Sequence, residues 1–219
     1  DTTATLVQNV EFDNSNATAC PWQKVLGGEG AHGVSILSRR AVERLETYTP
    51  AWPLPKIFRM TKGGKLIEGI FKGETINTPS MLCVEDYLDA LNWANSVGGL
   101  DGLIGRANAN AQVIHDFVDK TSWIGNLAKD PATRSNTSVC LTIVDADILA
   151  LDDAAQAAFA KGMVGLLDKQ GVALDIGAYR DAPSGLRIWT GGTVEKSDLE
   201  GLMPWLDWAF ATQKASLNS

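Results

Sequence analysis

The sequence has few cysteines and no long apolar run. No stretch of about twenty apolar residues occurs, which is the length that a membrane-spanning helix needs, so we expect no membrane span. Cys20, Cys83 and Cys140 lie far apart and form no CxxC pair. This pattern favours reduced thiols over a disulfide framework or a zinc site. The first residues have neither the basic start nor the apolar core of a secretory signal, so we expect a cytoplasmic protein.

An excess of basic residues is also absent. The 19 Lys and Arg residues face 26 Asp and Glu residues, for a formal net charge of −7. Nucleic-acid binding requires a clustered basic surface, so the charge argues against that class of partner. It leaves room for a local cationic pocket that binds a small anion. With 45% apolar residues, the 219-residue chain can fill the core of one large domain or two small ones.

The first 120 residues read as pieces of an α/β unit. Two short apolar runs favour strands at 17–19 and 34–37, and Ser38 is a suitable cap for a helix over 39–47. Prolines at 50, 53 and 55 predict an extended or turned segment. Thr78-Pro79 is a good helix start, and Gly98-Gly99 separates that helix from another over 100–120. The strands before residue 37 are too few for a stable sheet, which indicates a truncated unit.

From about residue 121 the pattern predicts a compact α/β module. Strands are expected at 138–144, 172–178 and 186–190. A helix capped by Asp152 or Asp153 runs to Lys169 and ends at Gly171. Ser197-Asp-Leu-Glu200 resembles a capping box that opens the last helix. The tryptophans of that helix, Trp205 and Trp208, are expected in the core.

The stretch Trp22-Gln-Lys-Val-Leu-Gly-Gly-Glu29 carries the most chemical information. It places Lys24 between a short strand and a Gly-rich turn. An amine held there and partly desolvated loses basicity and becomes a nucleophile towards an aldehyde, as a Schiff-base lysine requires. The alternative is an ordinary exposed lysine.

This stretch resembles the cofactor-lysine segment of phosphoserine aminotransferases, especially those of α-proteobacterial type. The resemblance extends over essentially the whole chain, and what the family carries before Asp1 is absent. It implies an α/β fold, the fold type I of enzymes that use pyridoxal 5′-phosphate (PLP). Residues 1–120 would be the C-terminal part of the PLP-binding large domain, and 121–219 the small domain. Further segments that resemble the family are 41–46, 48–58, 69–80, 130–139 and 177–189.

The resemblance also implies roles for particular residues. Lys24 would hold the cofactor and act as general base and acid, and Asp1 would pair with the pyridine nitrogen. Asn77 and Thr78 would reach across a homodimer to the cofactor phosphate. Arg187 would clamp the substrate carboxylate with its planar fork. The other readings are a solvated terminus for Asp1, a helix cap for Thr78 and a surface ion pair for Arg187.

Arg180 stands where many family members carry a histidine near the substrate phosphate, and a surface ion pair is the other reading for it. The implied reaction transfers an amino group from glutamate to 3-phosphohydroxypyruvate in serine biosynthesis, giving phosphoserine and 2-oxoglutarate. Since much of the family's cofactor and phosphate pocket would precede Asp1, we expect the chain alone to be weakly active or inactive. A non-catalytic or dimerising fragment is therefore the alternative.

Other signals are weaker. Residues 28–33 spell GxGxxG, but they lead into a strand-like run instead of a helix, so we interpret them as a turn. His32 and His115 lack metal-ligand or triad spacing, although His32 follows the lysine segment and stays open as a neighbour of the site. No metal site is expected. A cysteine desulfurase would need a mobile reactive cysteine, for which Cys20 is the one doubtful case.

Overall fold

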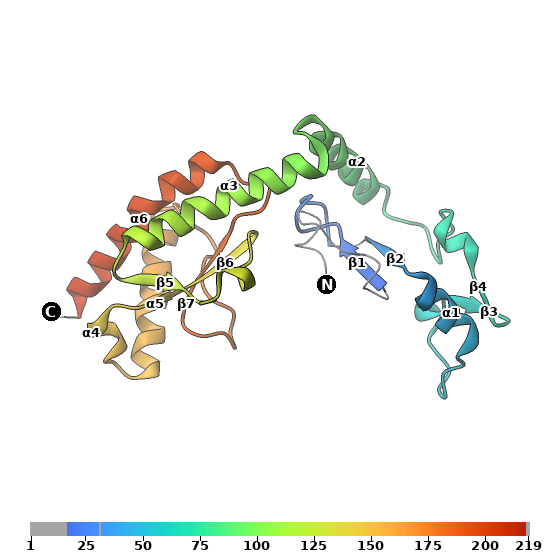
Figure 1. Ribbon diagram of the computed structural model, residues 1–219, viewed down its shortest axis with the longest axis horizontal. Helices are drawn as coiled ribbons and strands as arrows, with labels where there is room; N and C mark the ends of the chain where they lie inside the picture. Colours follow the sequence, from blue (N-terminus) through green and yellow to red (C-terminus); the bar gives the residue numbers. More distant parts are fainter. Residues whose placement is uncertain (1–16, 31, 218–219) are drawn as a thin grey trace. The chain divides into compact units, whose positions relative to one another are not determined.

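The computed structural model describes residues 17–30 and 32–217, so Asp1 and its expected role lie outside the described residues. The chain divides into two compact units, Asp1–Ser96 and Val97–Ser219, and each is described by itself. Both units mix helices and strands, which confirms the expected α/β class (Figure 1). Among the described helices, none combines the length and apolar character needed to cross a membrane.

The first unit is built on an antiparallel hairpin. Strand β1 (Ala17–Pro21) pairs with β2 (Gly33–Leu37), with Pro21 opposite Gly33 beside the connecting loop. A smaller hairpin joins β3 (Thr61–Lys62) to β4 (Lys65–Leu66). The 3-10 helices η3 (Lys56–Phe58) and η4 (Glu68–Phe71) flank it, and η3 directly follows the proline segment. The unit ends with α2 (Met81–Ser96).

The helix starts of this unit follow the available caps. Helix α1 (Arg39–Thr47) begins as expected, because the Ser38 hydroxyl accepts a hydrogen bond from the Ala41 amide. The expected start of α2 at Thr78-Pro79 is wrong, since the helix begins at Met81. The Ser80 hydroxyl accepts the Cys83 amide at 3.5 Å, so Ser80 supplies the cap. Thr78 consequently lies in the irregular segment before the helix.

The second unit packs four helices with a three-stranded antiparallel sheet of order β5-β6-β7. Cys140 of β6 lies opposite Arg187 of β7. The short 3-10 helix η5 (Pro131–Thr133) precedes β6. The remaining elements, in chain order, are α3 (Gly99–Lys120), β5 (Ile124–Asn126), β6 (Ser138–Ile143), α4 (Ala146–Leu149), α5 (Asp153–Lys169), β7 (Gly185–Trp189) and α6 (Lys196–Ser216).

Local signals explain most of these boundaries. Gly98 adopts a φ of 103° and Gly99 a φ of 63°, a left-handed turn that separates α2 from α3. Asp152 caps α5 by accepting the Ala155 amide. Gly171, with a φ of 66°, follows the end of α5. The expected helices over 100–120 and up to Lys169 are therefore confirmed.

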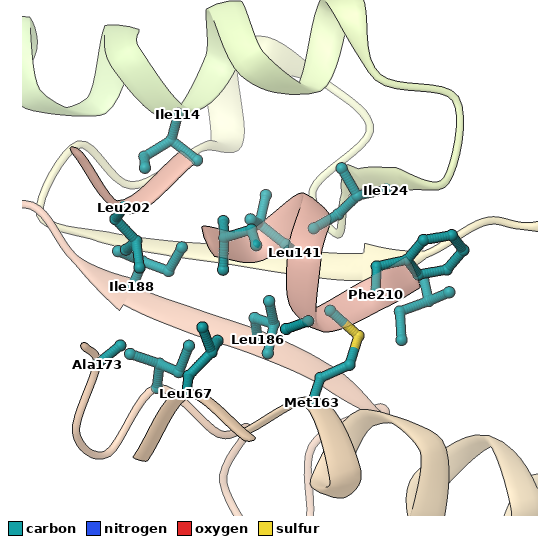
Figure 2. Close-up of a cluster of buried hydrophobic side chains, with 14 of the residues drawn as sticks. Ile114, Ile124, Leu141, Met163, Leu167, Ala173, Leu186, Ile188, Leu202 and Phe210 are labelled. Atoms are coloured by element: carbon teal, nitrogen blue, oxygen red, sulfur yellow. The ribbon is translucent and has the colours of Figure 1, made fainter. Parts of the chain in front are cut away.

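The core of the second unit lies between its sheet and its long helices. Alternate residues of β6 are buried, as are Leu186 and Ile188 of β7. Figure 2 shows these strand side chains meeting Ile114 of α3, Met163 of α5 and Phe210 of α6. The period of two along each strand leaves the intervening residues on the opposite face of the sheet, and Arg187 is one of them.

The expected strand over 172–178 is wrong. Only an isolated bridge joins Gly177 to Leu186 in this stretch. Asp175 has a φ of 54°, and this left-handed residue breaks the extended conformation that a ladder requires. A single backbone hydrogen bond, from the Arg187 amide to the Ile176 carbonyl at 2.8 Å, still ties the segment to β7.

The expected start and inner face of the last helix are also wrong. Helix α6 begins at Lys196, and its cap residue Glu195 makes no side-chain capping bond, so the capping box does not form. Trp205 and Trp208 are 39% and 37% exposed and pack edge to face against each other. The helix presents Leu199, Leu202, Leu206, Ala209 and Phe210 to the core, which leaves both tryptophans outside it.

Helix α3 belongs with the second unit through specific polar contacts. Asn110, 1% exposed, donates hydrogen bonds to the Gly191 and Val194 carbonyls at 3.2 and 2.8 Å. Arg106 donates to the Gly192 carbonyl at 2.6 Å. The domain boundary expected near residue 120 refers to a longer protein and stays a prediction.

Candidate functional site

Lys24 lies in a tight loop between β1 and β2, which we call the lysine loop (Trp22–Glu29). Its side chain is exposed, while the next residue, Val25, is 2% exposed and anchors the loop. The Gly27 amide donates to the Lys24 carbonyl at 3.1 Å, and the Gly28 amide donates to the Trp22 carbonyl at 3.0 Å. Gly27 has a φ of 68°, a conformation that favours glycine. These two hydrogen bonds fix the backbone of the loop on both sides of Lys24, and the lysine side chain is exposed to solvent.

The GxGxxG stretch lies within this hairpin connection and leads into β2, as expected for a turn. At Gly33 an added Cβ would lie 3.0 Å from the Cys20 carbonyl oxygen, so the close approach of the two strands requires glycine. A dinucleotide fingerprint would open a helix here, and a strand follows instead.

Three buried polar atoms in the connection between β1 and β2 have no hydrogen-bond partner in the described part of the chain. They are Trp22 Nε1, Gln23 Oε1 and His32 Nε2. Buried polar atoms normally have a partner, so these atoms fit a site that receives a polar ligand. The indole donates, the imidazole donates or accepts with its protonation state, and the Gln23 amide can turn to do either. Such a set suits the oxygens of a phosphorylated aldehyde beside an amine.

Gln23 is the residue that sequence reasoning passed over here. Its one signal in the sequence is its position next to Lys24. The sequence leaves His32 open as a neighbour of the site, and the structure places its ring 5.3 Å from that of Trp22, edge to face. Gln23 and His32 thus add polar side chains to the connection that carries Lys24, without a reaction assigned to them.

Helix α2 packs on the lysine loop. The Tyr87 ring stacks on Trp22, with centroids 4.1 Å apart and planes 6° from parallel. The Cys83 thiol donates to Glu29 Oε2 at 3.3 Å. Burial raises the pKa of the Tyr87 phenol, and the charge of Cys20 adds to the effect. The loop is therefore contacted on both sides of Lys24.

Asn77 lies in a bend and Thr78 in the irregular segment before α2, and both are exposed. Neither residue belongs to the first turn of the helix, which begins at Met81. The exposed amide and hydroxyl can contact a ligand or another chain. The favourable helix dipole acts at the first turn of α2, which begins at Met81, after both residues. Their role across a dimer stays a prediction.

Arg187 is held by two neighbours on the outer face of β7. Its side chain is 17% exposed, and Nη2 lies 3.4 Å from Asp175 Oδ2. The guanidinium carbon lies 4.3 Å from the centre of the Tyr179 ring, over its face. Nε is buried and has no hydrogen-bond partner among the described residues. Arg187 also lines a pocket of about 310 Å³ with Leu174, Asp175 and Trp189. The expected role of Arg187 in binding a carboxylate stays a prediction.

Arg180 occupies a different pocket. It is exposed in the turn before β7 and lines a pocket of about 530 Å³ with Lys161, Tyr179 and Ser184. Two cations make this pocket attractive to an anion. Tyr179 is the shared neighbour, since its ring lies under Arg187 and its side chain lines the Arg180 pocket. The two arginines thus come from one unit but do not line the same pocket.

The expected site residues are divided between the units. Lys24, Asn77 and Thr78 belong to the first unit, and Arg180 and Arg187 belong to the second. Their joint role in one site stays a prediction. Within residues 17–30 and 32–217, no cluster of three or more His, Cys, Asp or Glu side chains could hold a metal ion.

Comparison with known sequences finds no matching family profile but clear relatives. The chain is 54% identical over 209 residues to the phosphoserine aminotransferase of Methanosarcina mazei, covering 95% of this chain and 54% of that protein. A phosphoserine aminotransferase from Nocardioides sp. is 27% identical over 188 residues, covering 85% of this chain and 46% of the relative. The chain spans about half the length of the curated relatives it matches.

The similarity at 54% identity is to archaeal proteins of Methanosarcina, and the expectation of an α-proteobacterial type is therefore corrected. The segment from Trp22 to Glu29 suggested that type, but so short a segment does not distinguish branches of one family.

Solved structures agree on the fold. A phosphoserine aminotransferase from Bacillus circulans superposes with a TM-score of 0.69 at 18% identity, covering 96% of this chain and 52% of that one. An alanine–glyoxylate aminotransferase from Nostoc sp. gives 0.70 at 17% identity, covering 95% and 52%. A cysteine desulfurase from Escherichia coli gives 0.61 at 18% identity, covering 95% and 50%. The chain therefore has the fold of about half of a fold type I PLP enzyme, a fold that serves several reactions.

Proposed function

Because this chain is homologous to phosphoserine aminotransferases over about half of their length, we propose that it is the part of such an enzyme that carries the cofactor lysine. The full protein would transfer an amino group from glutamate to 3-phosphohydroxypyruvate, giving phosphoserine and 2-oxoglutarate, in the cytoplasm. The observation that carries the proposal is the connection between β1 and β2, which exposes the Lys24 side chain and also holds the buried unpartnered atoms of Trp22, Gln23 and His32.

The chemistry of this reaction divides between cofactor and protein. When bound, PLP supplies an electron-withdrawing ring that stabilises negative charge at the substrate Cα. The Lys24 amine would hold the cofactor as a nucleophile and, once the substrate amine has displaced it, would take the proton from the substrate Cα and return it to the cofactor carbon C4′. A loop closed by its own backbone hydrogen bonds keeps the amine in reach of these carbons, because little freedom remains beyond the lysine side chain itself.

The other expected residues bind and orient. Arg187 would hold the substrate carboxylate with two parallel N–H donors, exchanging its contact with Asp175 for the stronger bidentate pair. Arg180 would supply positive charge to the substrate phosphate. Asn77 and Thr78 would donate to the cofactor phosphate of a partner subunit in a homodimer, and Asp1 would pair with the pyridine nitrogen. These roles follow the resemblance residue by residue.

A specific observation favours inactivity of this chain on its own. Large apolar side chains of the first unit are exposed, among them Trp52 at 81%, Ile57 at 71% and Phe58 at 65%. A surface of this kind indicates missing contacts. We therefore expect little or no transamination by the 219-residue chain alone, whereas the complete protein is an enzyme. The alternative function is a non-catalytic or dimerising fragment.

The desulfurase alternative finds no support in the cysteines. Cys20 is 3% exposed and Cys83 is 1% exposed, so neither is a mobile, accessible nucleophile. Cys140 is exposed but lies within strand β6. The similarity to a desulfurase structure concerns the fold.

The proposal is tested by trapping. PLP is added to the purified chain, the visible absorbance is recorded, and borohydride fixes any covalent adduct for peptide mass spectrometry. We expect an adduct on Lys24 that Lys24→Ala abolishes and Lys62→Ala, which removes an exposed lysine of the same unit, does not. Labelling spread evenly over the lysines would contradict the cofactor role. Measurable phosphoserine transamination by the chain alone would contradict the expected inactivity.

A further inference from the structure

Helix α2 reaches the lysine loop with two side chains that lie one turn apart. Cys83 and Tyr87 are four residues apart and therefore share a face of the helix. Tyr87 stacks on Trp22, before Lys24, and Cys83 donates to Glu29, after it. One helix face thus contacts both ends of the loop.

The contacts rest on a buried floor. Cys83 of α2, Cys20 of β1 and Val25 of the lysine loop are 1%, 3% and 2% exposed, so each of these three elements buries an apolar side chain here. The Trp22–Tyr87 stack is closely parallel, which lets the two rings share a large apolar area. Both features favour a single position of the loop against the helix.

The hydrogen bonds of the loop determine its shape and leave its position to other contacts. The bonds from Gly27 to Lys24, from Gly28 to Trp22 and from Trp22 to His32 all join residues of one hairpin. Regions of this kind, held by few contacts from outside, open locally more easily than a packed core does. Contacts from a separate element restrict that opening.

We propose that Tyr87 is a positioning residue for Lys24 and that Cys83 supports it through Glu29. Through this pair, α2 holds the lysine loop so that Lys24 keeps one location relative to the rest of the hairpin. The segment with Asn77 and Thr78 runs directly into α2, so the same helix joins that segment to the lysine. The inference rests on the proposed function only in taking Lys24 as the cofactor lysine.

Amide hydrogen exchange tests the contact itself on the 219-residue chain. Tyr87→Ala is expected to speed exchange at Gly27 and Gly28 by about tenfold, because the loop loses its anchor. Tyr87→Phe keeps the ring and is expected to leave these rates unchanged. The matched control is Tyr48→Ala, which removes an exposed tyrosine of the same unit that packs on Arg44. Equal rates in the original chain and in Tyr87→Ala would overturn the proposal.

Selective labelling tests the consequence for Lys24. The chain is treated with PLP and borohydride, and the adduct on Lys24 is measured relative to that on Lys62. Tyr87→Ala is expected to lower this ratio by about threefold or more, and Tyr87→Phe to restore it. If the unsubstituted chain shows no preference for Lys24, the proposed function fails, while the exchange rates still decide the positioning role.

A second variant provides a test for the case in which Tyr87→Ala unfolds the first unit. Glu29 is exposed, so Glu29→Ala removes the contact with Cys83 without disturbing α2. We expect about threefold faster exchange at Gly28 with an unchanged circular dichroism spectrum. If Tyr87→Ala unfolds the first unit, this variant decides: an unchanged Gly28 rate in it would overturn the proposal.

Discussion

At the scale of single residues, Gly185 shows how closely β6 and β7 approach. A Cβ at this position would overlap the Leu141 carbonyl oxygen. Since the obstacle is backbone, the neighbour cannot move aside as a flexible side chain would.

We predict that Gly185→Ala lowers the free energy of unfolding of the second unit by about 1–3 kcal/mol, the range of an overpacked core. Urea denaturation followed by circular dichroism measures the change. Gly165→Ala is the matched control: no atom lies within 4 Å of its Cβ in helix α5, so it is expected to stabilise by about 0.5–1 kcal/mol. An equal free energy of unfolding for the two variants would show that β6 and β7 can move apart at little cost.

The residues of the candidate site were predictable to different degrees. The position of Lys24, between a strand and a glycine turn, followed from the sequence and is what the structure shows. The neighbours that approach it from far along the chain, such as Tyr87, did not follow, because their contact depends on how α2 lies against the hairpin. The contacts of Arg187 with Tyr179 and Asp175 were not predicted either, because they too depend on tertiary packing.

At the scale of elements, Asp145 joins two helices of the second unit. It caps α4 by accepting the Asp147 and Ile148 amides, and it accepts two hydrogen bonds from Lys214 of α6 at 2.8 and 2.7 Å. The bond from Lys214 is the main reason why the pKa of Asp145 lies below its usual value, and partial burial opposes it. A carboxyl with a lowered pKa stabilises the fold above its unfolded pKa and loses that contribution as pH falls through the folded one.

We predict that Asp145→Asn lowers the melting temperature at pH 7 by about 3 °C or more. Asparagine still caps α4, so the loss reports the charge. The difference from the original chain should disappear as the pH falls well below 3.8, the ordinary value for Asp, because the original carboxyl then also becomes neutral. Thermal melts between pH 7 and pH 2.5 provide the check.

Asp147→Asn is the control for the Asp145–Lys214 ion pair. Asp147 also lies 2.8 Å from Lys214, but its side chain is 77% exposed, so solvent screens the interaction. We expect Asp147→Asn to lower the melting temperature less than Asp145→Asn does. A pH-independent difference for Asp145→Asn would mean that capping geometry, and not the ion pair, carries the stabilisation.

Helices were more predictable than strands in this chain. The boundaries of the helices over 39–47 and 153–169 lie where the cap residues and glycine predict them. These signals are local, because a cap residue bonds to backbone amides a few residues away. The expected strand over 172–178 failed because Asp175 takes a left-handed conformation that no composition rule anticipates. The expected core position of Trp205 and Trp208 failed because hydrophobicity does not reveal which side of α6 faces the sheet.

At the scale of the whole molecule, the two units differ in what they bury. The core cluster of the second unit brings together side chains of α3, α5, α6 and the sheet. Among the described residues of the first unit, the buried apolar side chains are Cys20, Val25, Cys83 and Ala94. A unit that buries so little has a weak hydrophobic drive to fold.

We predict that the fragment Val97–Ser219 folds by itself and melts cooperatively, because it contains the whole core cluster. In the full chain, amides of the first unit are expected to exchange faster than those of the second. Differential scanning calorimetry of the fragment and exchange mass spectrometry of the full chain measure the two effects. A fragment without a cooperative transition would show that the second unit needs the first.

The sequence by itself determined the α/β class, most helix ends and the position of Lys24 in a turn, because these depend on residues close together along the chain. Only the tertiary structure decided which residues meet: Tyr87 with Trp22, Tyr179 with Arg187, and Lys214 with Asp145. The first and last of these pairs join residues far apart in sequence, and all three contacts depend on packing and backbone direction, which local patterns do not specify.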